Sequence, residues 1–199
     1  LFGHYAQSHH PLPTAAVSRI AQTLAQLDTQ DEESRALLAQ YSGVADAYES
    51  PAPKATMALA LGDAYLRTDR LPEALEQYAA AGDAEGRLRA ACVATELGRP
   101  ERAFAEWQRV RELAGEDVRL LTVAAYMLGE AAADDVRKTA RDLSPPALAH
   151  YVIALRLWTE ADASAAQEFA QARAATGAWF APLAERVRIA FGTTEDTLP

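Results

Sequence analysis

Small and apolar residues recur at intervals of three, four and seven along most of this chain, the spacing that places them on one face of an α-helix. The clearest stretch covers residues 58–78, where two such runs flank the polar break Thr68-Asp69-Arg70. Val, Ile and Thr are sparse, and nowhere do they alternate over the length of a strand. The pattern therefore predicts an all-α protein whose helices are paired across short turns.

Helix ends are marked by capping residues and prolines. Thr14 is a good N-cap for the first helix, and Glu32-Glu33 suit the start of the second, where the helix dipole favours negative charge. Ser50-Pro51-Ala52-Pro53 is expected to end that second helix. Pro72 and Pro100 fall where later helices begin, in a first turn that does not need their missing N–H groups.

The second helix of each pair carries a small or apolar residue at a corresponding position. These residues are Ala74, Ala103, Val136 and Ala165, at separations of 29, 33 and 29 residues. Trp107 follows Ala103 as Tyr78 follows Ala74, so Trp107 is predicted to belong to the core. We expect about 11 helices, with an irregular segment at 1–13, a single helical domain at 14–191 and a frayed tail at 192–199.

One stretch also resembles a known family. Ala58-x-x-Leu61-Gly62-x-x-Tyr65 followed by Ala74-x-x-x-Tyr78 resembles the tetratricopeptide repeat, whose pattern is W-x-x-L-G-x-x-Y and then A-x-x-x-F. The resemblance is specific over 54–81, good over 84–113 and weak over 117–175. It implies a right-handed α-solenoid of antiparallel helix pairs, a TPR-like superhelix. The uneven spacing, against a period of about 34 residues, predicts a curvature unlike that of a regular array.

In tetratricopeptide arrays the first helix of each pair lines a concave groove, so the resemblance also implies which residues a partner would contact. Members that grip the C-terminal carboxylate of chaperones use Lys and Asn where this chain has Leu59 and Asp63, so carboxylate clamping is not expected. A peptide or a helix would suit such a mixed groove. The implied groove residues are Thr56, Leu59, Asp63, Leu66, Arg67, Glu85, Leu88, Arg89, Thr95, Glu96, Leu121, Leu128, Tyr151, Leu155 and Trp158.

Charge and composition narrow the functional classes. The net charge is −9 and no basic stripe is visible, so nucleic-acid binding by this segment is not expected. No apolar run approaches the roughly 18–20 residues needed to span a bilayer. Cys92 is the only cysteine, which excludes a disulfide within the chain and a zinc site built on thiols.

Several residues suggest chemistry, but each has a simpler structural explanation. His4, His9 and His10 have no Cys or carboxylate at a useful spacing, so an exposed loop is expected there. Cys92 has no neighbouring His and is expected to be a small packing residue. Asp134-Asp135, like Glu32-Glu33, is assigned to a helix start. Since no nucleophile elbow, phosphate-binding glycine loop or H-E-x-x-H motif occurs, neither enzymatic activity nor a cofactor is expected.

Two aromatic groups are left open between core and contact surface. Trp158 lies near a helix end, where either role fits. Trp179 and Phe180 point about 100° apart on the predicted last helix, which runs to Phe191. Since a terminal helix has fewer neighbours, an exposed aromatic side chain at one of these two positions is worth testing.

The leading hypothesis is a non-enzymatic scaffold or adaptor that binds a peptide or helix of another protein, with homo-oligomerisation left open. The alternative is a regulatory or oligomerisation domain of a larger bacterial transcriptional regulator or signalling protein, which the start at Leu1 rather than Met suggests. A third hypothesis is an all-α enzyme with a central cavity, for which the groove offers mainly Asp63 and Glu96. The cytoplasm is the expected compartment, and the periplasm stays open if a signal segment was removed.

Overall fold

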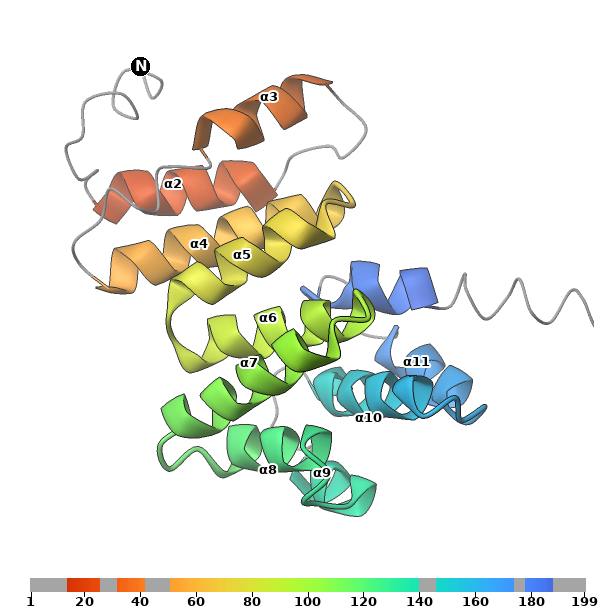
Figure 1. The fold of residues 1–199 in the computed structure, drawn as a ribbon. Coiled ribbons are helices and arrows are strands. Elements are labelled where there is room, and N and C mark those ends of the chain that lie inside the picture. Colours follow the sequence, from red (N-terminus) through yellow and green to blue (C-terminus); the bar gives the residue numbers. More distant parts are fainter. Residues whose placement is uncertain (1–13, 26–31, 42–50, 140–145, 174–177, 188–199) are drawn as a thin grey trace, which may run out of the picture. The chain divides into compact units, whose positions relative to one another are not determined.

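The computed structural model describes residues 14–25, 32–41, 51–139, 146–173 and 178–187, whose regular structure is entirely helical (Figure 1). This confirms the all-α prediction for these residues. Residues 181–187 are helical as well. The helices with defined ends are α2 (Thr14–Ala25), α3 (Glu32–Tyr41), α4 (Pro51–Arg67), α5 (Leu71–Ala81), α6 (Ala84–Glu96), α7 (Pro100–Leu113), α8 (Val118–Met127), α9 (Ala133–Thr139), α10 (Ala147–Thr159) and α11 (Ala165–Ala172).

Prolines and acidic pairs lie where the sequence places them, with one correction. Pro72 lies in the first turn of α5 and Pro100 opens α7, as predicted. α4 begins at Pro51, within the segment predicted to end the preceding helix, because a first helical turn tolerates proline as well as a loop does. The three N-terminal histidines and the tail at 192–199 lie outside the described residues.

The chain divides into two compact units, residues 1–90 and 91–199, and the boundary lies inside α6. In the first unit, α4 packs against α5, α2 and α3. In the second unit, α8 packs against α7, α9 and α10, while α10 also packs against α11. Most of these contacts join helices that are next, or next but one, in the chain, which is the packing pattern of helical repeats.

Helices α4, α6, α8 and α10 all end in the same hydrogen-bonded turn. In α10, the N–H of Ala161 donates to the carbonyl of Trp158 and the N–H of Asp162 to that of Leu157. The equivalent pair of bonds closes α4, α6 and α8, and each is a Schellman motif with one left-handed residue. The left-handed residues are Asp69, Gly98, Gly129 and Ala161, with φ of 60°, 63°, 84° and 57°. The same helix end therefore recurs at α8 and α10, where the sequence motif is weak.

The predicted packing residues form the core. Ala74, Ala103, Val136 and Ala165 are all buried, and so are Trp107 and Cys92, as expected. Phe180 is also buried and stacks on the Tyr151 ring at a centroid distance of 5.0 Å. Trp179, the more accessible of the two neighbours, meets the same ring edge-on at 6.2 Å. Among the described helices, none combines the length and apolar character needed to cross a membrane.

Candidate functional site

The main candidate site is a pocket of about 730 Å³ in the second unit, which we call the aromatic pocket. Its walls come from the turn between α6 and α7, the first two turns of α7, and the C-terminal ends of α8 and α10. The volume falls in the range of ligand-binding clefts. The lining residues are Thr95, Gly98, Pro100, Ala103, Phe104, Trp107, Met127, Leu128, Gly129, Arg156, Trp158, Thr159 and Glu160.

Three aromatic side chains line this pocket. Phe104 follows the buried Ala103 and lies beside the inward stripe of α7, so 53% of its surface stays exposed. Trp107 is on that stripe and only 2% exposed, and its indole Nε1 is buried without a hydrogen-bond partner. Trp158, near the end of α10, is half-buried. An exposed phenylalanine beside two tryptophans is the kind of apolar surface that marks an interaction site.

The charged residues of the aromatic pocket are already paired with each other. The Arg156 Nε donates to Glu160 Oε1 at 2.8 Å, and its Nη1 donates to the Tyr126 carbonyl. The same guanidinium lies over the Tyr126 ring, 4.7 Å from its centroid. Two contacts with Tyr126 thus hold Arg156 against α8, and they help to fix the end of α10 beside the end of α8.

A smaller pocket of about 300 Å³, the Asp63 pocket, lies in the first unit. Thr56, Leu59, Asp63 and Arg89 line it together with Ala21 and Ala60, so four of the implied groove residues do come together. Asp63 Oδ1 accepts from the Tyr78 hydroxyl at 2.7 Å and from Arg89 Nη1 at 2.6 Å. Arg89 also donates to Glu85 through Nε at 2.8 Å.

The electrostatics of the Asp63 network indicate that it stabilises the packing of helices. Burial alone lowers the pKa of Arg89, but Asp63 and Glu85 outweigh that effect and raise it. Burial, followed by the Asp63 charge, raises the pKa of the Tyr78 hydroxyl well above its usual value. Both groups therefore keep their protons at neutral pH, and the network ties α4, α5 and α6 together.

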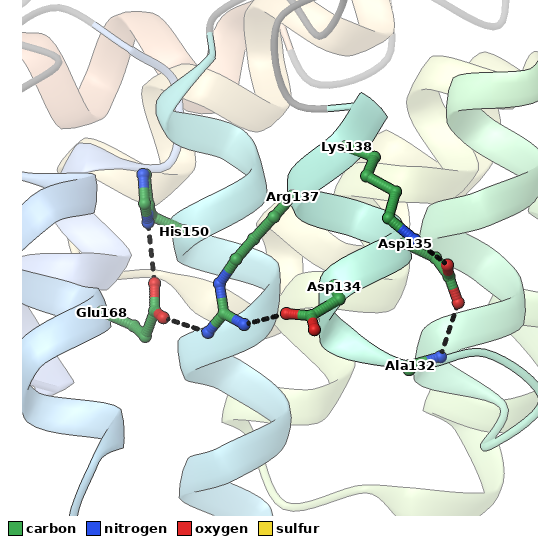
Figure 2. Close-up of polar contacts among 7 residues, drawn as sticks. All are labelled: Ala132, Asp134, Asp135, Arg137, Lys138, His150 and Glu168. Atoms are coloured by element: carbon green, nitrogen blue, oxygen red, sulfur yellow. Dashed lines mark hydrogen bonds and ion pairs between the residues drawn. The ribbon is translucent and has the colours of Figure 1, made fainter.

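A second polar network joins α9, α10 and α11 (Figure 2). Glu168 accepts from Arg137 Nη2 at 2.7 Å through one oxygen and lies 2.7 Å from His150 Nδ1 through the other. Arg137 also donates to Asp134 at 2.8 Å. Partial burial raises the pKa of Glu168, but the hydrogen bonds from Arg137 and His150 outweigh it, and the pKa is lowered. Both Glu168 oxygens are occupied, so this cluster links helices as an ion-pair chain.

The acidic pair on α9 behaves as a helix start. Asp134 and Asp135 lie in the first turn of α9, and Asp135 Oδ2 accepts from the backbone N–H of Ala132 (Figure 2). This bears out the assignment of the pair to a helix start. In the part of the chain that the structure describes, no group of three His, Cys, Asp or Glu residues is placed to hold a metal.

Glu96, an implied groove residue, is engaged in the interior instead. The Tyr151 hydroxyl donates to Glu96 Oε1 at 2.6 Å, and the Tyr151 ring packs against Phe169, Trp179 and Phe180. Burial raises the pKa of Glu96 to about 8, although the hydrogen bond from Tyr151 acts in the opposite direction. A carboxyl group that is largely protonated at neutral pH in this position serves packing more readily than ligand binding.

The remaining implied groove residues fall into three groups. Thr95, Leu128 and Trp158 line the aromatic pocket. Arg67 donates to the Leu24 carbonyl of α2, and Leu121 is partly exposed on α8. Four residues are buried, so their assignment to a partner-contacting surface is corrected: at these positions the first helix of the pair turns inward. They are Leu66, Leu88, Tyr151 and Leu155.

Among the residues of the aromatic pocket that sequence reasoning missed are Phe104 and Arg156, and it gave Trp107 a single role. Phe104 was not singled out. Its position next to the buried stripe of Ala103 and Trp107 could have indicated an exposed apolar side chain, because the sequence shows that spacing. Arg156 was missed because nothing in the sequence places it beside Tyr126. Trp107 is in the core as predicted, and it also lines the pocket.

Comparisons with known proteins add nothing to this geometry: no family model, no curated protein and no solved structure matches the chain. The resemblance to tetratricopeptide repeats therefore stays a prediction from the residues of the motif.

Proposed function

We propose that this chain is a non-enzymatic interaction module that binds a segment of another protein, a peptide or a helix, in the aromatic pocket. The observation that carries the proposal is the position of Phe104, which leaves a large apolar side chain 53% exposed at a pocket of about 730 Å³. Aromatic side chains at concave sites supply much of the binding energy in protein interfaces.

The lining of the pocket supports binding over catalysis. Its titratable side chains are Arg156 and Glu160, which pair with each other. The carboxylate and imidazole groups of the Asp63 and Glu168 networks also have their hydrogen bonds directed at neighbouring helices. General acid–base chemistry needs a group within hydrogen-bond reach of a substrate, and the lining of the aromatic pocket supplies surface rather than such a group.

A displayed library of random peptides, selected on the whole chain, tests the proposal. We expect enriched peptides to bind the parent protein and to lose binding to Phe104→Asp, which places a charge in the pocket. Val118→Asp is the matched control, since Val118 is 65% exposed on α8 and does not line the pocket. Failure to enrich any peptide, or an equal loss with both variants, would overturn the proposal.

A further inference from the structure

The aromatic pocket combines three features that together select one kind of side chain: aromatic walls, converging helix ends and pre-paired charges. Phe104, Trp107 and Trp158 present rings from two different helices, α7 and α10. The faces of aromatic rings carry partial negative charge and attract cations such as guanidinium and ammonium groups. Apolar side chains would also fit such walls, so the other two features decide whether the bound side chain is charged.

Helix ends make the pocket electronegative. Gly98, Gly129 and Glu160 mark the places where α6, α8 and α10 end at the pocket wall. Schellman turns satisfy two carbonyls at each of these ends, and the aligned peptide dipoles leave a partial negative charge there. α7 contributes the only opposing end, and its first residue is Pro100, which has no N–H to donate. Three negative ends against one positive end favour a cation.

The donors of the pocket are not available to an anion. Arg156 already donates to Glu160 and to the Tyr126 carbonyl, and the Trp107 Nε1 is enclosed rather than exposed. Glu160 stays 51% exposed at the rim while it holds Arg156. The chain as a whole carries a net charge of −9, which repels anionic ligands at long range and attracts cationic ones.

We propose that the occupant of the aromatic pocket is a basic side chain, Arg or Lys, on an otherwise apolar segment of a partner protein. This inference rests on the proposed function and specifies its chemistry. The cation lies against the Trp158 ring, beside the exposed Glu160 carboxylate at the rim. Neighbouring apolar side chains of the partner cover Phe104, because the pocket is larger than one side chain needs.

The test uses the selected peptides that bind the parent protein and lose binding to Phe104→Asp. We expect each to contain an Arg or Lys whose replacement by norleucine, which has a similar length and no charge, weakens binding. Trp158→Leu should weaken binding of the basic peptide roughly twofold to thirtyfold, the range of a cation–aromatic contact. The affinity of the norleucine peptide should change by no more than about twofold. Glu160→Gln, at an exposed position, provides a second variant that keeps the fold intact and should also weaken the basic peptide selectively.

The outcomes separate the two proposals. If the library yields no Phe104-dependent peptide, the proposed function fails and this inference fails with it. If such peptides appear but are anchored by acidic or purely apolar residues, the inference fails while the proposed function stands. Equal effects of Trp158→Leu and Glu160→Gln on the basic and norleucine peptides would likewise overturn the inference. A selective loss of the basic peptide with both variants supports it.

Discussion

Gly62 is the residue on which the packing of α4 against α5 depends most directly. A Cβ atom at Gly62 would lie 2.4 Å from both Cδ1 and Cε1 of Tyr78, and the Tyr78 ring is fully buried. The hydroxyl of Tyr78 is also held by Asp63 at 2.7 Å, which leaves the ring little freedom to move away. Even a methyl group therefore has no room at this position.

We expect Gly62→Ala to lower the free energy of unfolding. Overpacking costs roughly 1–3 kcal/mol, which outweighs the gain of about 1 kcal/mol that alanine brings to a helix interior. In a Tyr78→Leu background the ring is gone, so the same change should be neutral or stabilising. Denaturant unfolding of the four proteins measures this, and a stabilising effect in the parent background would contradict the packing argument.

Glu96 makes stability depend on pH. Its pKa is raised from 4.5 to about 8 in the folded chain, so the folded state binds more protons than the unfolded state between these values. The stability that Glu96 contributes is complete below about pH 4.5 and falls as pH rises to about 8. We expect Glu96→Gln, which still accepts from Tyr151, to unfold with a free energy that exceeds the parent value by an amount that grows across this window.

Equilibrium unfolding at a series of pH values gives that difference directly. Glu101→Gln, at an exposed position on α7, is the matched control for the loss of one negative charge. A parent-minus-variant difference for Glu96 that stays constant from pH 4.5 to 8 would contradict the raised pKa.

At the scale of elements, the shared end of α4, α6, α8 and α10 makes a reciprocal prediction. Ala161 adopts a φ of 57°, which costs a non-glycine residue roughly 1 kcal/mol. Gly98 has a φ of 63° and open space around its Cβ position, so alanine there would bear the conformational cost alone. We expect Ala161→Gly to raise, and Gly98→Ala to lower, the free energy of unfolding by about 1 kcal/mol each. Changes of the same sign in thermal melts of the two variants would contradict a common cap.

At the scale of the molecule, each unit is a set of helices packed on their neighbours in the chain. Such an arrangement buries alanine-rich helix faces and leaves pockets where the ends of non-adjacent helices meet, as at α8 and α10. The right-handed superhelix and the continuous groove that the tetratricopeptide resemblance implies stay predictions. The peptide selection tests the function at this scale, because it uses the whole chain and assumes no groove.

The sequence predicted the fold better than the site. Helical periodicity, Pro72, Pro100 and the small residues Ala74 and Ala103 are local signals, and each was confirmed. The contact surface was predicted by analogy with a regular array. That analogy assigned Thr56, Leu59, Asp63 and Arg89 to the groove, and these four line one pocket while their contact with a partner stays a prediction. It failed at Tyr151 and Leu155, which are buried because α10 is packed on α8, α9 and α11.

The sequence by itself determined that this protein is helical, where most helices begin and end, and which small residues let them approach. These properties follow from intervals of three to seven residues and from single residues with restricted backbones. Only the tertiary structure decided that Phe104, Trp107 and Trp158 share one pocket and that Arg156 is held by Tyr126 and Glu160. The physical reason is that a pocket depends on the spacing and rotation of helices whose lining residues lie up to 65 residues apart in the sequence, and no local pattern encodes those quantities.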